Sequence, residues 1–560
     1  MKLEEARRWL ENMLDRIEQD VTTGKYRLGV ISGNEKRALE VLLGGSPAVP
    51  VVPPAIAPEP VQPVDQPTES VAAPVAPAPV SVALDTASLK VSAPENPEVT
   101  VCLDFGTAMS KAFAMVGDSE PIELALGKRA GSPAGGYPVE SSLFISDDGI
   151  LYFGHQAVDR GRAAASAGRK RYDSPKARLS MGEQVDINKV PVEKDINPVA
   201  ATPVTEGELI TLYLAYLTDL ASSELVAQGY SRYCARRFAR PCWPDARNKW
   251  AEPLLREMLA QAQILADTFH DQWNGGIPLA KAKLAVDQVR KLGVWPVVLL
   301  DKDIPEPVAA AASLMLKKDE AQRELFLVID VGAGTTDFGL FLLQHNPQRD
   351  VCLVRIVPGT IDFLEQAGNR VDDLLKHFVL KQEGIDGFGP EGRHDLAYMQ
   401  SDIRLNKERL FRDKRVEIPL ANGSKATVAL DDFLADDRVK KFGEQLQRKV
   451  EEVLGAAGDG YLDLMRDTYV KVVLTGGGAD LPMVQRLAAG PITITKGNAS
   501  RNILRRAATK VPAWIHDSYP QFEPQYPQLA VAIGGANPDV PDLGPSFADF
   551  MGQAKPTYTA

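Results

Sequence analysis

Leu327-Val-Ile-Asp330-Val-Gly332-Ala333-Gly334-Thr335-Thr336-Asp337 is one of two related stretches that decide the fold. Its apolar start predicts a buried β-strand, which ends at an acidic residue and leads into a glycine-rich turn with hydroxyl side chains. Such a turn lets backbone N–H groups approach a phosphate, and an acid at the end of the strand can hold a hydrated cation. A simple tight hairpin explains a single stretch equally well, so one copy does not identify a site.

The second stretch is Val101-Cys-Leu-Asp104-Phe-Gly106-Thr107, which repeats the order of apolar strand, acid and glycine–threonine turn. Two such stretches in one chain predict two related half-domains, each of which brings an acidic hairpin to a shared cleft. A plain hairpin would have to occur twice by chance to give the same pattern.

A third glycine-rich stretch is Val472-Val-Leu-Thr475-Gly476-Gly477-Gly478-Ala-Asp480-Leu-Pro482. It predicts a strand, a triple-glycine turn and a helix that begins near Pro482. Glycines at this point permit a nucleoside to approach the backbone closely. A tight strand-to-helix turn with positive φ explains the same residues without a ligand.

Short β-rich runs alternate with helical stretches from Val99 to about Ala536, which is typical of an α/β fold. The expected strands include residues 101–103, 325–329, 351–357 and 471–474. We expect one lobe over residues 99–322, a second over 323–540 and a tail over 541–560. Helical periodicity in Leu254, Leu255, Met258 and Leu259 predicts a helical insertion within the first lobe, near residues 251–294.

The composition excludes several classes of protein. Sixty-three basic and 74 acidic residues give a net charge of -11, which disfavours general binding to nucleic acids or anionic membranes. Two basic stretches, around residues 169–178 and 232–240, are expected to be solvated faces. Four widely spaced cysteines and the lack of an apolar run long enough for a signal peptide or a membrane span predict a cytoplasmic protein with reduced thiols.

The N-terminal residues predict a separate module on a tether. Leu3, Leu10, Met13, Leu14 and Ile17 recur at helical spacing, and a capping-box pattern at Ser32 and Glu35 begins a second helix that stops at two glycines. We expect residues 1–45 to bind a protein partner or to self-associate. Residues 46–98 are rich in Pro, Ala and Val, which predicts an extended linker.

Five motifs in the expected order resemble the nucleotide-binding domain of the DnaK-type heat-shock chaperones, the heat-shock protein 70 family of the actin-like ATPase superfamily. Besides the three glycine-rich stretches, Ile304-Pro-Glu306-Pro-Val-Ala-Ala-Ala311 is similar to the family's first connecting segment, and Pro527-Gln-Leu-Ala-Val-Ala-Ile-Gly534-Gly535-Ala536 is similar to its second connecting helix. The resemblance implies a two-lobed α/β fold built from duplicated ribonuclease-H-like domains. It also implies a slow, partner-regulated ATP hydrolase that uses ATP or ADP and Mg²⁺.

The resemblance assigns roles residue by residue. Asp104 and Asp330 would hold hydrated Mg²⁺, Thr335 would lie at the γ-phosphate, Lys176 matches the catalytic lysine, and Glu306 would order magnesium-bound water. The nucleotide contacts that it implies are Gly106, Thr107, Gly332, Gly334, Thr335, Thr336, Asp337, Lys407, Gly476, Gly477 and Gly478.

Several residues depart from the family pattern. Arg404 replaces a glutamate that contacts the base, and Phe411 and Asp480 replace a serine and an arginine, so base selectivity is open. The family's peptide-binding domain is not expected after the second connecting helix. The insertion is either a neutral decoration or a second docking surface for a protein partner.

Three functions remain open from the sequence. The leading one is a Mg-ATP-driven conformational switch that acts on protein partners. The alternatives are a filament-forming actin-like ATPase and a small-molecule kinase or phosphatase on the same fold.

Overall fold

A computed structural model describes residues 17–19, 26–28, 80–117, 120–133, 135–180, 186–314, 322–346, 351–539 and 542–543. The chain divides into two compact units, one of residues Met1–Ala78 with Phe388–Pro390 and one of residues Pro79–Gly387 with Glu391–Ala560. In the first unit, strands β1 (Ile17–Gln19) and β2 (Tyr26–Leu28) pair antiparallel. Ile17 therefore lies in a strand and not in the helix that its spacing predicts. The other residues of the two expected N-terminal helices lie outside the described residues, as do residues 544–560 of the expected tail.

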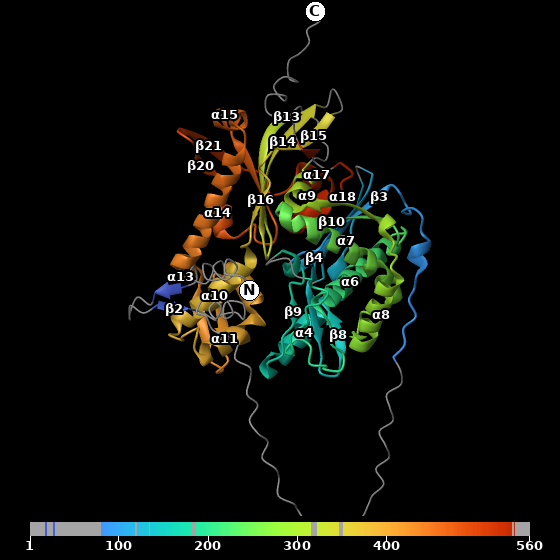
Figure 1. Ribbon diagram of the computed structural model, residues 1–560. Coiled ribbons are helices and arrows are strands. Elements are labelled where there is room, and N and C mark those ends of the chain that lie inside the picture. Colours follow the sequence, from blue (N-terminus) through green and yellow to red (C-terminus); the bar gives the residue numbers. More distant parts are fainter. Residues whose placement is uncertain are drawn as a thin grey trace, which may run out of the picture. The chain divides into compact units, whose positions relative to one another are not determined.

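The second unit is mixed α/β, as the sequence predicts (Figure 1). The first of its large sheets has the order β12-β10-β3-β4-β5, with β6 paired to β4. Strand β3 is antiparallel to β4 and parallel to β10, and β10 is parallel to β12. The strands are β3 (Val99–Asp104), β4 (Met109–Val116), β5 (Glu120–Ile122), β6 (Val139–Glu140), β10 (Ala235–Arg240) and β12 (Leu300–Pro305).

The second large sheet has the order β20-β21-β19-β13-β14-β15-β22, with β16 paired to β14. Strand β13 is antiparallel to β14 and parallel to β19, and β19 is parallel to β21. The strands are β13 (Gln322–Val331), β14 (Thr336–Asn346), β15 (Val351–Ile356), β16 (Asp362–Leu364), β19 (Val470–Thr475), β20 (Gly490–Lys496), β21 (Ala499–Ala507) and β22 (Asp542–Leu543).

The two large sheets share one strand plan. On one side of the central strand, β3 or β13, two strands follow antiparallel, β4 and β5 in the first sheet and β14 and β15 in the second. On its other side two strands follow parallel, β10 and β12 in the first sheet and β19 and β21 in the second. The two acidic hairpins of the sequence occupy the same place in this plan. Asp104 pairs with Lys111 and Asp330 pairs with Asp337 across their hairpins.

Two helices, α9 (Glu306–Ala312) and α18 (Tyr526–Ala536), lie between the large sheets. Each contacts strands of both sheets, and the two helices pack against each other. Their crossing requires a glycine, because a Cβ on Gly534 would lie 1.7 Å from the carbonyl oxygen of Ala309. These helices are the two segments that resemble the family's connecting segments.

Two small sheets in the second unit pack against helices. One small sheet has the order β11-β8-β7-β9, and the other pairs β17 with β18. Their strands are β7 (Ser142–Ile145), β8 (Ile150–Phe153), β9 (Tyr172–Asp173), β11 (Ile277–Pro278), β17 (Arg415–Pro419) and β18 (Lys425–Ala429). The longer helices are α4 (Gly154–Ala164), α6 (Glu206–Ala227), α7 (Asp245–Thr268), α8 (Leu279–Leu292), α10 (Gly368–Gln382), α11 (Pro390–Gln400), α12 (Ile403–Asp413) and α14 (Asp437–Ala456).

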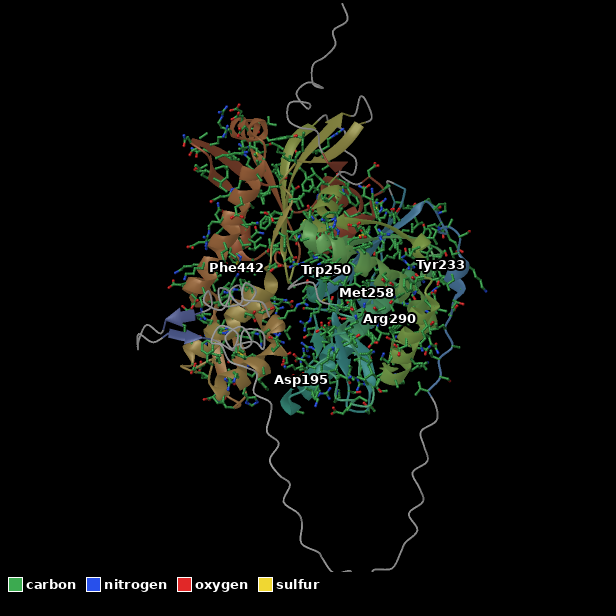
Figure 2. All side chains as sticks on the ribbon, viewed as in Figure 1. Asp195, Tyr233, Trp250, Met258, Arg290 and Phe442 are labelled. Atoms are coloured by element: carbon green, nitrogen blue, oxygen red, sulfur yellow. The ribbon has the colours of Figure 1, made fainter. Side chains whose placement is uncertain are left out.

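Separate hydrophobic cores lie on the outer faces of the large sheets, and a third lies around α9 and α18. Met258 on α7 belongs to the core of the first sheet and Phe442 on α14 to that of the second (Figure 2). Phe113 of β4, Phe341 of β14 and Ile533 of α18 share the third core. This third core joins the two sheets through apolar contacts.

The C-terminal part of the expected linker differs from the prediction. Residues 80–98 are part of the second unit, where Val82, Leu84 and Leu89 are half-buried against the core that includes α7. The backbone N–H of Asp85 donates to Thr268 Oγ1 at 3.0 Å. The residues of the expected insertion lie mostly in helices α7 and α8. One of its faces is thus covered by residues of the same chain.

Helix α6 is the one described helix that is long and apolar enough to cross a membrane. Of its most apolar window, 89% is buried inside the second unit, as in the core helix of a soluble protein. Its N-terminus is fixed by a capping box between Thr205 and Glu208.

Candidate functional site

A cleft in the second unit brings together residues from both acidic hairpins, from α9, from α12 and from the triple-glycine turn. Its empty space is about 980 Å³ including the opening to solvent. The predicted residues that line it are Asp104, Gly106, Thr107, Lys176, Glu306, Asp330, Gly332, Thr335, Lys407, Gly476, Gly477 and Gly478.

The two acidic residues lie at corresponding strand ends because both hairpins follow the same strand plan. Asp104 is the last residue of β3 and accepts a hydrogen bond from Lys111 Nζ at 3.0 Å. Asp330 is the penultimate residue of β13 and accepts one from Thr475 Oγ1 at 2.8 Å. Among the described residues, neither Asp104 Oδ1 nor Asp330 Oδ2 accepts a hydrogen bond. One oxygen of each carboxylate is therefore left without a hydrogen-bond donor among the described residues.

The turns of the two hairpins meet in the cleft. A Cβ on Gly334 would lie 3.0 Å from Thr107 Oγ1. Within the described chain, the backbone N–H groups of Thr107, Ala108 and Ala333, which line the cleft, have no hydrogen-bond acceptor. Backbone N–H groups without an internal partner, presented by successive turn residues, are suited to bind an anion.

The carbonyl groups of both turns are held from the opposite side. In the second turn, the backbone N–H groups of Gly368 and Asn369, at the start of α10, donate to the carbonyls of Gly332 and Ala333 at 3.1 and 2.7 Å. In the first turn, Ser141 Oγ donates to the carbonyl of Gly106 at 2.7 Å. Each of these carbonyls shares a planar peptide unit with the N–H group of the next residue. Holding the carbonyl therefore also fixes the direction of that N–H group.

Lys176 reaches the cleft from the segment between β9 and α5 (Ala177–Ser180) and forms an ion pair with Glu306, the first residue of α9. Lys176 is 2% exposed and Glu306 6% exposed. Burial lowers the pKa of Lys176, but Glu306 and then Asp104 oppose this, and the net effect is a raised pKa. The lysine therefore stays cationic between the acids of the cleft.

Two buried acids of the second hairpin have raised pKa values. Burial raises the pKa of Asp330 to about 7, and the charge of Glu306 adds to this effect. Burial also raises the pKa of Asp337 to about 8, again with Glu306 as the next cause. A concentration of acids in a buried site favours protons or a cation there.

Within the described ranges, no three His, Cys, Asp or Glu side chains converge closely enough to hold a metal ion directly. Mg²⁺ commonly keeps several of its waters and contacts one or two carboxylates. Asp104 and Asp330, each with one oxygen that accepts no hydrogen bond from the described residues, fit a hydrated Mg²⁺ that is also held by a phosphate. They do not form a closed protein cage.

Helices α10 and α12 bring side chains of both charges to the cleft. Lys407 Nζ lies 2.9 Å from Asp372 Oδ1 and donates to the carbonyl of Gly368 at 3.0 Å. Arg404 pairs with Glu408 one helical turn away on α12, and its Nη1 donates to the carbonyl of Ala108 at 3.3 Å. The residue that replaces the family's base-contacting glutamate thus contacts the first hairpin.

The triple-glycine turn packs on the second hairpin. Gly476 has φ of 84°, and a Cβ there would lie 2.3 Å from the carbonyl oxygen of Val331. The N–H of Gly478 donates to the same carbonyl at 2.9 Å. Both the positive φ and the close approach explain the glycines at these positions, and helix α16 (Pro482–Gln485) after the turn is a single turn long.

Three predicted contact residues do not line the cleft. Gly334 lies against Thr107. Thr336 is fully buried and donates to the carbonyl of Gln366, and Asp337 is fully buried and accepts from the N–H of Cys242 at 2.8 Å. Asp337 therefore ties the second hairpin to the end of β10.

Other residues of the cleft were not predicted. Lys111 follows the stretch that ends at Thr107, and its strand position opposite Asp104 could have suggested a role. Gln528 lies within the predicted second connecting helix, whereas no local pattern marks Asn369 or Asp372, which also line the cleft. In a comparison with protein-family models, no model matches this chain.

Proposed function

We propose that this chain binds Mg-ATP in the cleft and hydrolyses it slowly. The single observation that carries the proposal is the meeting of two acid-ended hairpins whose turns present unpaired backbone N–H groups to one space, beside a buried lysine. An anion with several phosphates, bound with a hydrated cation, satisfies all three features at once.

The shared strand plan supports the finer fold that the resemblance implies. We infer that the two large sheets are the centres of two ribonuclease-H-like domains in a two-lobed, actin-like ATPase. The equivalent places of Asp104 and Asp330 favour this reading, because a duplicated half-domain would put its acidic hairpin in the same position twice.

The chemistry proposed for the site is the attack of water on the γ-phosphorus, with release of ADP and inorganic phosphate. Bound Mg²⁺ would neutralise charge on the phosphate oxygens. Asp104 and Asp330 would hold its waters, and the turn N–H groups would fix the phosphates. Lys176, kept cationic by Glu306, would stabilise negative charge that develops in the transition state.

The proposed biological role is a switch that acts on protein partners in the cytoplasm. Helices α9 and α18 contact both large sheets, so a movement of one sheet relative to the other would have to be accommodated where these helices cross. Residues 1–45 would supply an attachment to a partner or to a second copy.

Calorimetry on the full-length protein tests the proposal. We expect ATP to bind in the presence of Mg²⁺ and more weakly after chelation, and we expect phosphate to be released without an added acceptor. Asp467→Asn, outside the lining of the cleft, is the matched control and should bind ATP as the wild type does. No magnesium-dependent binding would reject the proposal. Turnover only with a small-molecule acceptor would favour the kinase alternative, and ATP-dependent sedimentation would favour the filament.

A further inference from the structure

A chain of buried hydroxyl groups lies directly behind the first turn of the cleft. Ser110 of β4 and Tyr213 of α6 are fully buried, and Ser141, between β6 and β7, is 1% exposed. Ser110 Oγ lies 3.0 Å from Ser141 Oγ, and Tyr213 Oη lies 3.3 Å from it. Burial of hydroxyl groups costs free energy unless each is hydrogen-bonded, and here every member of the chain has a partner.

The chain ends on the backbone of the turn. Ser141 Oγ donates to the carbonyl of Gly106 at 2.7 Å, and its backbone N–H donates to the carbonyl of Ala108 at 2.9 Å. The turn has little room to adjust at this point, because a Cβ on Gly106 would lie 1.9 Å from the carbonyl oxygen of Met109. Ser141 thus fixes two carbonyls of the turn, as the start of α10 fixes two in the second turn.

The same residue also holds the segment that carries Lys176. The carbonyl of Ser141 accepts from the backbone N–H of Ser174 at 3.0 Å. Its neighbour Ser142 donates from Oγ to Asp173 Oδ1 at 2.7 Å and pairs with Asp173 between β7 and β9. Ser174 has φ of 58°, a left-handed conformation that a serine adopts only when its surroundings hold it there.

We propose that Ser141 is a positioning residue that sets the turn of residues 105–108 and the Lys176 segment relative to each other. Its hydroxyl and backbone N–H act on the turn, and its carbonyl acts on residue 174. One consequence of the inference rests on the proposed function: binding of the phosphates of a nucleotide should depend on Ser141, whereas binding of a nucleoside without phosphates should depend on it less. The link between the two segments is a property of the protein without ligand and can be tested alone.

Hydrogen–deuterium exchange on the full-length, ligand-free protein tests the link. Ser141→Ala removes the hydroxyl and keeps the backbone groups, so we expect amide exchange at residues 105–109 to accelerate about three- to tenfold, the range that one internal hydrogen bond supports. Exchange at residues 174–177 should accelerate by a smaller factor, because the Ser141 carbonyl that accepts from Ser174 remains. Ser110→Ala, which removes a hydroxyl partner but no contact with the turn, should show a smaller effect in the same direction. The matched control is Thr211→Val on α6, which also removes a buried hydroxyl-to-carbonyl hydrogen bond and should leave both segments unchanged.

A binding measurement tests the consequence. Ser141→Ala should weaken binding of Mg-ATP about tenfold, while binding of adenosine should change less than about twofold, because adenosine lacks the phosphates that the turn would hold. Unchanged exchange in either segment, or equal loss of ATP and adenosine affinity, overturns the inference. If Ser141→Ala does not fold, Ser110→Ala decides by the same two measurements. A wild type that binds neither ligand rejects the proposed function, and the exchange data still decide the link.

Discussion

Lys176 and Glu306 form an ion pair inside the cleft although 130 positions separate them in the sequence. Both side chains are buried. Glu306 begins α9, one of the two helices that contact both large sheets. The pair therefore joins the cleft to the helix crossing, and its loss should affect both stability and chemistry.

Lys176→Ala should slow ATP hydrolysis by roughly 10²- to 10³-fold, the effect typical of removing one transition-state donor. The same change should lower the free energy of unfolding by about 3–5 kcal/mol, because it leaves the buried Glu306 carboxylate without its partner. From the sequence alone we would expect the fold to be unaffected. Single-turnover phosphate release and denaturant unfolding measure the two effects.

The double variant Lys176→Met with Glu306→Gln separates these effects. It removes both buried charges, so we expect it to regain most of the lost stability but none of the activity. A double variant that hydrolyses ATP at the wild-type rate would show that neither residue takes part in the reaction.

Asp330→Asn should weaken ATP binding about tenfold in Mg²⁺ and leave it unchanged or slightly stronger in a chelator. The amide oxygen can still accept from Thr475 Oγ1, so the local fold should persist. The lost negative charge removes the attraction for the cation and also the repulsion of a metal-free triphosphate. Calorimetry with and without Mg²⁺ gives the two affinities, and an equal loss in both conditions would contradict a role at the metal.

Arg162→Ala should accelerate release of ADP about two- to fivefold at low salt, in line with the strength of exposed ion pairs. Arg162 Nε of α4 lies 2.6 Å from Asp402 Oδ1, the residue before α12, and the side chains are 42% and 31% exposed. This pair joins α12, which carries Arg404 and Lys407, to the side of the cleft formed by the first sheet. Stopped-flow displacement of a fluorescent ADP measures the rate.

Two comparisons check this reading of the Arg162 pair. The difference from wild type should vanish near 1 M salt, where the Debye length is about 3 Å. Asp159→Ala removes the other partner of Arg162, which lies on the same helix α4, and should leave release unchanged. A variant effect that persists at high salt would mean that Arg162 acts by packing and not by charge.

The hairpins could be predicted from the sequence because each is encoded by adjacent residues. An apolar run, an acid and a glycine turn suffice to place Asp104 and Asp330 at the ends of strands, and both lie there. The prediction missed the residue at which the second turn ends and β14 begins. Thr335 faces the cleft, whereas the next residues, Thr336 and Asp337, belong to β14 and are held by Gln366 and Cys242.

Contacts between distant elements could not be predicted in the same way. Lys407 on α12 meets Asp372 on α10 through helix packing, which leaves no trace in spacing. The packed residues 80–98 did carry a signal: Val80, Val82 and Leu84 alternate as in an extended segment with one apolar face, and no proline occurs from residue 80 to 93. The proline-rich composition before residue 80 concealed this change.

Deletion of residues 1–79 and deletion of residues 1–98 should therefore differ. The shorter deletion keeps Val82, Leu84 and Leu89 on the core that includes α7, and we expect its unfolding temperature to equal that of the full chain. The longer deletion exposes that core and should lower the free energy of unfolding by about 2–4 kcal/mol, since full burial of one such side chain is worth about 1.5–3 kcal/mol and these are half-buried.

ATP affinity should survive the shorter deletion, while a partner or an oligomeric state is lost if residues 1–45 form an attachment module. Thermal unfolding, calorimetry and the mass in solution distinguish these outcomes. Equal stability of the two deletions would show that residues 80–98 contribute nothing to the second unit.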